Sequence, residues 1–116
     1  MNWMVLIYAL ITVESSGINT AVGDYGKSIG CLQIQEGVIK DVNRIYTKEY
    51  TKMDRYGRHQ SVEICKLYLT YWGSVYERNT GKEATYEVLA RIWNGGPYGY
   101  KKEKTEVYWA KVKRHL

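Results

Sequence analysis

The chain has 116 residues, a length that fits one domain, which we place at residues 1–116. Apolar residues make up 45% of the chain and charged residues 25%, as is usual for a globular protein. The net charge of +5 would suit a polyanionic partner, but the basic residues are scattered and form no nucleic-acid-binding motif, so we expect no nucleic-acid partner.

The first predicted element is a helix over residues 2–14 that is apolar on every side, as expected of a central buried helix. Its apolar run, residues 3–13, is shorter than the ~20 residues that span a bilayer, so we expect no transmembrane span. No Lys or Arg precedes the run and no A-x-A-like site follows it, which argues against a signal peptide.

Residues 15–28 contain three glycines and several turn formers, and they predict an ordered loop with room for a short hairpin. Apolar residues at three- and four-residue spacing then predict a second helix over residues 29–45, with a break at Gly37 left open. Polar, Tyr-rich residues 46–58 indicate a loop.

An apolar stripe predicts a third helix over residues 59–78. Thr80 and Glu83 have the spacing of a capping box for a fourth helix that ends at residues 94–97, and a last helix is expected over residues 104–114. The fold class is therefore mainly α, with at most a short β-hairpin. Cys31 and Cys65 fit no CxxC motif, and we favour two buried free thiols over a disulfide.

Glu14 is the first candidate functional residue. At 100° per residue it continues the stripe of Trp3 and Ile7 and stands where the helix enters the glycine-containing loop. Partial burial there would raise the pKa of a carboxyl group and allow it to donate a proton. The alternative is a Glu that caps backbone N–H groups in the following loop.

Three sequence blocks occur in order. In the first, Glu14-Ser15 leads through a loop to Gly30-Cys31-Leu32-Gln33-Ile34; the other two are Arg91-Ile92-Trp93-Asn94-Gly95-Gly96-Pro97 and Thr105-Glu106-Val107-Tyr108. Together these blocks resemble the lytic transglycosylases. The resemblance implies a lysozyme-like domain with Glu14 as catalytic acid and Tyr108 as its hydrogen-bond partner. The substrate-binding residues that it implies are Ser28, Gly30, Gln33, Trp93, Asn94 and Gly95. Four positions depart from the family pattern: Cys31-Leu32 replaces Leu-Met, Trp93 replaces Tyr, and Gly95 replaces Ala.

Asp24 is a second candidate carboxylate, in a Gly23-Asp24-Tyr25-Gly26 stretch that resembles the goose-type lysozymes. It would position water for inverting hydrolysis if it faced Glu14 across about 6.5–9.5 Å. Otherwise Glu14 would act alone and give the transglycosylase product, which we favour. A turn-forming role for Asp24 is the alternative. Glu36 is a weaker candidate that better fits the first turn of a helix.

The resemblance implies cleavage of the β-1,4 bond between N-acetylmuramic acid and N-acetylglucosamine, with a peptidoglycan glycan strand as partner. The place of action would be the bacterial cell wall, in the periplasm or outside the cell, for a phage-encoded protein or a domain of a larger one. A catalytically silent glycan-binding protein is the alternative. We expect a monomer, no cofactor, and no metal, because His59 and His115 are isolated.

Overall fold

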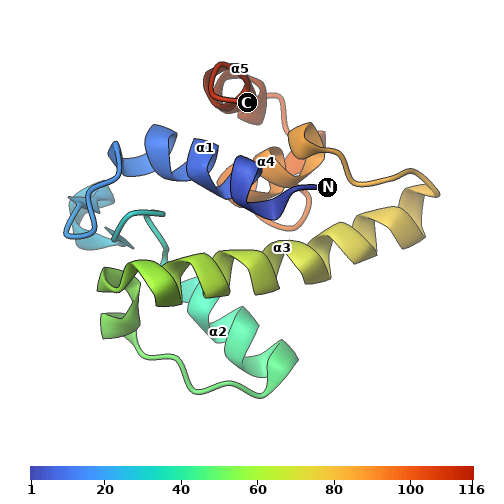
Figure 1. The fold of residues 1–116 in the computed structure, drawn as a ribbon. Coiled ribbons are helices and arrows are strands. Elements are labelled where there is room, and N and C mark those ends of the chain that lie inside the picture. Colours follow the sequence, from blue (N-terminus) through green and yellow to red (C-terminus); the bar gives the residue numbers. More distant parts are fainter. The chain divides into compact units, whose positions relative to one another are not determined.

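The computed structural model describes all residues, 1–116, and is mainly helical: helices account for 66% of the chain (Figure 1). In chain order the elements are α1 (Trp3–Ser15), β1 (Val22–Gly23), the 3-10 helix η1 (Asp24–Gly26), β2 (Ser28–Ile29), α2 (Glu36–Tyr46), η2 (Lys52–Tyr56), α3 (Arg58–Thr80), α4 (Tyr86–Gly95), η3 (Gly99–Lys101) and α5 (Thr105–Lys113). The only sheet is one antiparallel strand pair, so the expected mainly-α class with a short hairpin is confirmed. None of the helices combines the length and apolar character needed to cross a bilayer.

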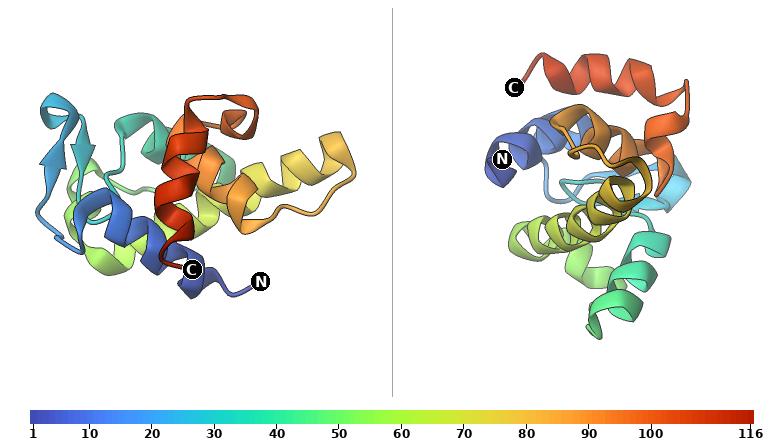
Figure 2. Two further views of the ribbon diagram at one scale, coloured as in Figure 1. Left: turned by 90° about the horizontal axis from the view of Figure 1, so that it is seen from above. Right: turned by 90° about the vertical axis from the view of Figure 1, so that its right-hand side faces the viewer.

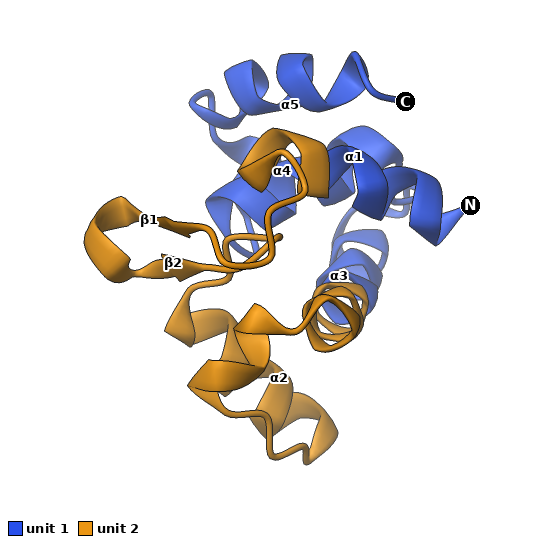
Figure 3. Ribbon diagram, turned by 60° about the vertical axis from the view of Figure 1, so that its left-hand side comes forward, with its two compact units in different colours: residues 1–10, 69–116 blue, residues 11–68 orange.

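The chain divides into two compact units, coloured separately in Figure 3. Unit 1 consists of residues 1–10 and 69–116, and unit 2 of residues 11–68, so that α1 and α3 each supply residues to both. Apolar side chains are fully buried in both units. In unit 1 they include Leu6, Ile7, Leu10, Leu69, Leu89, Ile92 and Val112, and in unit 2 Leu32, Ile34, Val42 and Ile64. The single domain expected at residues 1–116 stays a prediction.

The hairpin of unit 2 confirms the turn expected between residues 15 and 28 (Figure 2). Val22 pairs with Ile29 and Gly23 with Ser28. At the tip, Asp24, Tyr25 and Gly26 have φ angles of 51°, 57° and 90°, three left-handed residues in succession. Such angles are uncommon for residues other than glycine, and they turn the chain back within a few residues.

The helix expected over residues 29–45 is wrong in its first part, because α2 begins only at Glu36. Ile29 instead forms an antiparallel bridge with Ile34. Between them Gly30 and Gln33 have φ angles of 85° and 50°, which a right-handed helix cannot include. Ile34 is therefore buried in a turn before the helix. The break that was left open at Gly37 is absent, because that residue lies inside α2.

The segment expected as a loop over residues 46–58 contains a 3-10 turn, η2, with a capping box of its own. The Thr51 side chain accepts from the third residue of η2, and the Thr51 main-chain N–H donates to the Asp54 carboxylate at 2.7 Å. α3 follows from Arg58 to Thr80 and confirms the third helix, with slightly wider bounds than expected.

In unit 1 the capping residue of α4 is Thr85, not Thr80. The Thr85 hydroxyl accepts from the Val88 main-chain N–H at 3.2 Å. The Thr80 hydroxyl donates to the Tyr76 carbonyl of its own helix and accepts from the Lys82 N–H, so it helps to end α3. The expected capping box was therefore placed one turn too early.

The expectation that the first helix is buried on every side is also wrong. Met4, Val5 and Tyr8 of α1 are exposed by 38%, 39% and 59%, whereas Leu6 and Ile7 are fully buried. Positions 4, 5 and 8 share one helix face at three- and four-residue spacing, so α1 carries an apolar stripe toward solvent.

Candidate functional site

The predicted site residues fall into two groups, one in each unit. Unit 2 contains Glu14, Asp24, Ser28, Gly30 and Gln33, and unit 1 contains Trp93, Asn94, Gly95 and Tyr108. We expected Tyr108 to donate a hydrogen bond to Glu14. Such a contact would involve both units, and it stays a prediction.

Glu14 is half-buried and lies one residue before the end of α1. The next residue, Ser15, fixes the chain at this point. Its hydroxyl lies 2.7 Å from the Cys31 carbonyl oxygen and 3.2 Å from that of Ile11, and it accepts from the Gly17 N–H at 3.1 Å. The serine after Glu14 therefore has a structural role, because Ser15 connects the end of α1 to the turn after β2.

Asp24 is oriented by its own hairpin. The Ser28 hydroxyl donates to the Asp24 carboxylate at 2.5 Å, and the Gln35 amide nitrogen lies 3.4 Å from the same hydroxyl oxygen. The Lys27 N–H also donates to the Asp24 carbonyl at 3.2 Å. These contacts are those of a residue that holds a turn.

Gln33 and Gly30 brace the turn between β2 and α2. The Gln33 amide nitrogen donates to the carbonyls of Ala21 and Gly30 at 3.2 and 3.0 Å. A Cβ at Gly30 would come within 1.9 Å of the Arg55 carbonyl oxygen, so η2 packs directly against this glycine. The space beside Gly30 is therefore filled by the protein's own backbone.

The two cysteines are free and buried, which confirms the expectation of buried thiols. Burial raises the pKa of the Cys31 thiol, although the charge of Arg58 and a hydrogen bond with Ser61 act against it. Burial raises the pKa of the Cys65 thiol well above its usual value, and the charges of Glu14 and Cys31 add to that effect.

In unit 1 the predicted residues surround the junction of α4 and α5. Trp93 is half-buried, Asn94 is exposed and Tyr108 is buried. A Cβ at Gly95 would lie 2.6 Å from the Thr105 methyl group. Thr105 is itself fully buried: its hydroxyl accepts from the Arg91 Nε at 2.8 Å and lies 2.8 Å from the Gly99 carbonyl oxygen.

Three exposed apolar side chains on the hairpin and the loop before it were not among the predicted sites. They are Ile18, Val22 and Tyr25, exposed by 54%, 57% and 106%, and we call them the hairpin edge. Tyr25 stands at the left-handed tip, where the backbone presents the whole side chain to solvent.

A cavity of about 520 Å³ was also missed by sequence reasoning. It is lined by Gly26, Lys27, Gln35, Glu36, Gly37, Lys52 and Arg55. The only local signal was the Thr51-to-Asp54 spacing of a capping box, which marks η2. No group of three or more His, Cys, Asp or Glu side chains is arranged to hold a metal ion.

No family model matches the chain, and no curated protein matches it either. Among solved structures, the chain is similar to one chain in the crystal structure of Aeromonas hydrophila PliI in complex with Meretrix lusoria lysozyme. The identity is 26% and the TM-score 0.70, over 95% of this chain and 87% of that one.

These comparisons contradict the expected assignment to the lytic transglycosylases and goose-type lysozymes. No family model supports it, and the solved structure that matches is a PliI–lysozyme complex. The expected peptidoglycan lytic transglycosylase or muramidase activity is corrected with it, because that expectation rested on the resemblance and the match points to a complex between proteins. Several residues of the matched blocks have structural roles: Ser15, Gly30, Gln33 and Thr105 each hold a turn or a helix end. The site roles expected of Gly30 and Gln33 stay predictions.

Proposed function

We propose that this protein acts by forming a complex with another protein, in a pairing of the kind formed by PliI and lysozyme. The observation that carries the proposal is the structural match, which covers 95% of the chain and belongs to a complex between two proteins. The effect of such a pairing is inhibition of the lysozyme, and its place is the cell envelope or the space outside it. A protein partner replaces the glycan strand expected from sequence.

The hairpin edge is the surface that we assign to the partner. Exposed apolar side chains that lie together mark interaction sites, and Tyr is enriched among the residues that dominate binding energies. The hairpin is also held in shape by the Ser28–Asp24 and Gln33–Ala21 hydrogen bonds. A fixed edge loses little conformational entropy when it binds, which favours affinity.

The test measures binding of the purified chain to both proteins of the matching complex. In one arm, clearance of bacterial cell walls by Meretrix lusoria lysozyme is followed with and without the chain, and the chain alone provides the baseline. In the other arm, binding to Aeromonas hydrophila PliI is measured by calorimetry. Suppressed clearance supports the proposed inhibition, and binding to PliI without suppressed clearance would contradict it. No binding to either at ~10 µM, the weak end for a specific interface, refutes the proposal.

The surface is tested with two matched variants. Tyr25→Ala removes the phenol at the tip, and a loss of 2 kcal/mol or more at an interface hot spot weakens binding about thirtyfold. Tyr8→Ala removes a phenol from α1 that is also more than half exposed, and it should leave affinity within about twofold. Equal losses of affinity in Tyr25→Ala and Tyr8→Ala would show that the hairpin edge is not the binding surface.

A further inference from the structure

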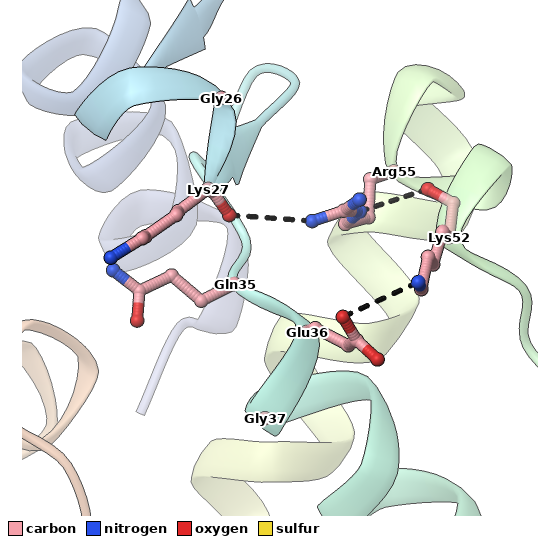
Figure 4. A pocket seen from close by; sticks show the side chains of 7 residues that line it. All are labelled: Gly26, Lys27, Gln35, Glu36, Gly37, Lys52 and Arg55. Atoms are coloured by element: carbon pink, nitrogen blue, oxygen red, sulfur yellow. Dashed lines mark hydrogen bonds and ion pairs between the residues drawn. The ribbon is translucent and has the colours of Figure 1, made fainter.

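The cavity of unit 2 lies where the end of η1, the start of α2 and η2 meet (Figure 4). Its lining includes three cationic side chains, Lys27, Lys52 and Arg55, and one anionic side chain, Glu36. The charges sum to +2, since three positive groups face one negative group. A concave site with this balance attracts anions.

Arg55 is the central residue of the cavity, because its cation is buried without a counter-ion. The residue is only 8% exposed. Its Nε donates to the Lys52 carbonyl at 2.8 Å, and its Nη1 donates to the carbonyls of Ile34 and Lys27 at 2.9 and 3.4 Å. No carboxylate lies within ion-pair distance of it, whereas Arg91 and Arg44 each have one.

The Nη2 nitrogen of Arg55 has no acceptor in the chain, so two N–H donors are left unused. Nη2 is not sealed from solvent, because the only enclosed side-chain polar atom without a partner is the Tyr50 hydroxyl. Figure 4 shows the guanidinium directed from η2 toward the main-chain carbonyl of Lys27, whose side chain extends away from Arg55. A buried cation without an anionic partner is costly, and the free N–H groups of Nη2 can each donate to an oxyanion.

The start of α2 supplies further donors to the same space. The main-chain N–H groups of Glu36 and Gly37 open an 11-residue helix, and the Gln35 side chain does not cap them. A Cβ at Gly37 would meet nothing within 4 Å, so a ligand can approach this backbone closely. The partial positive charge of a helix N-terminus also favours an anion here.

Glu36 does not supply the missing counter-ion. Its carboxylate pairs with Lys40 and Lys52, at 3.4 Å in each case. The hydrogen bond with Lys40 and the charge of Lys52 lower the pKa of this carboxyl group, so it stays ionised and bound to those lysines. The Arg55 guanidinium and the Lys27 ammonium therefore have no carboxylate within ion-pair distance.

We propose that this cavity is a binding site for a dianionic phosphate group. The two Nη2 N–H groups of Arg55 and the first N–H groups of α2 bind its oxygens, and Lys27 and Lys52 supply charge. A phosphate matches the charge balance of +2 better than a single carboxylate, and it offers enough oxygens for donors from three elements. The inference is independent of the proposed protein partner.

The test is an NMR titration of the folded, isotope-labelled chain with inorganic phosphate at pH 7.5 and low ionic strength. Saturable shifts of the Glu36 and Gly37 amides are expected. Lys27→Gln should weaken binding about fivefold, as loss of a partly exposed charge contact worth about 1 kcal/mol does. Lys48→Gln removes the same charge from an exposed position outside the cavity and should change affinity less than twofold.

Two further titrations sharpen the result. Acetate, which carries a single charge, should bind at least tenfold more weakly than phosphate, and glycerol 2-phosphate distinguishes a phosphate monoester from the free ion. Arg55→Lys keeps the charge but loses the Nη2 donors, and it should reduce binding below that of Lys27→Gln if its circular dichroism is native. If Arg55→Lys does not fold, the comparison of Lys27→Gln with Lys48→Gln is the deciding test of the site. Shifts that do not saturate, or equal losses in Lys27→Gln and Lys48→Gln, would overturn the site.

Discussion

A methyl group added at Gly30 should destabilise the protein by an amount that can be worked out from its surroundings. Gly30 has a φ of +85°, where a side chain costs roughly 1–2 kcal/mol. Its Cβ would also lie 1.9 Å from the Arg55 carbonyl oxygen, when contacts under 3.0 Å essentially do not occur. The backbone must therefore separate by at least 1.1 Å (3.0 minus 1.9).

That separation disturbs two hydrogen bonds at once. The Ser61 hydroxyl donates to the Arg55 carbonyl at 2.8 Å, and the Gly30 N–H donates to the Ala21 carbonyl at 2.8 Å. At about 1 kcal/mol each, with the cost of the φ angle, Gly30→Ala should destabilise the fold by about 3 kcal/mol. Urea unfolding followed by far-ultraviolet circular dichroism measures this difference.

Gly26→Ala is the matched control. Gly26 has a φ of +90°, but a Cβ there would meet nothing within 4 Å. This variant isolates the cost of the left-handed backbone, about 1 kcal/mol, from the cost of the overlap. If Gly30→Ala were no more destabilising than Gly26→Ala, the packing of η2 against Gly30 would be refuted.

Three other predictions follow from burial and capping. Burial and the raised pKa values of Cys31 and Cys65 should keep both thiols protonated at pH 8. Neither thiol should react with a disulfide reagent until urea unfolds the chain, and rapid reaction of the native protein would contradict this. Thr85→Ala should lower the free energy of unfolding in urea by about 1 kcal/mol, because it removes the cap of α4, whereas Glu83→Ala should leave it unchanged. Equal losses would instead support the capping box expected at Thr80 and Glu83. Burial, with a smaller contribution from the charge of Asp41, raises the pKa of Tyr68 from 10.0 to about 12, so the folded state holds this proton more tightly and stability is lost as pH rises from 10 to 12. Tyr68→Phe should flatten that loss, by up to about 2 kcal/mol, and an unchanged pH slope would speak against it.

The helices that depend on local pattern were predictable from the sequence. The apolar stripe of α3 predicted that helix close to its observed bounds, and the glycines of residues 15–28 predicted a loop with room for the hairpin. The stretch from Ile29 to Gln35 was misassigned because its conformation depends on distant partners. Gly30 fits against Arg55, and Gln33 donates to Ala21, and neither contact leaves a mark in the local spacing.

The sites were less predictable than the helices, for a related reason. The cavity combines Lys27, the start of α2 and Arg55. Lys27 and Arg55 lie in two separate stretches that the sequence indicated as loops, so no local pattern places them together. The family resemblance relied on short blocks rich in Gly, Ser and polar residues. Turns and helix ends require the same residue types, as Ser15 and Thr105 show, so such blocks do not separate a structural origin from a functional one.

Arg55 also determines which positions of this protein can vary in evolution. Its three hydrogen bonds end on the main-chain carbonyls of Lys27, Ile34 and Lys52, and a main-chain carbonyl is present whatever the side chain of its residue. Relatives of this chain could therefore exchange Lys27 or Lys52 without loosening the joint between the three segments, whereas replacement of the arginine would release all of them together. A purely structural role of Arg55 would conserve the arginine and allow its neighbours to vary. Conservation of Lys27 and Lys52 in relatives would indicate that an anion-binding role has been kept as well.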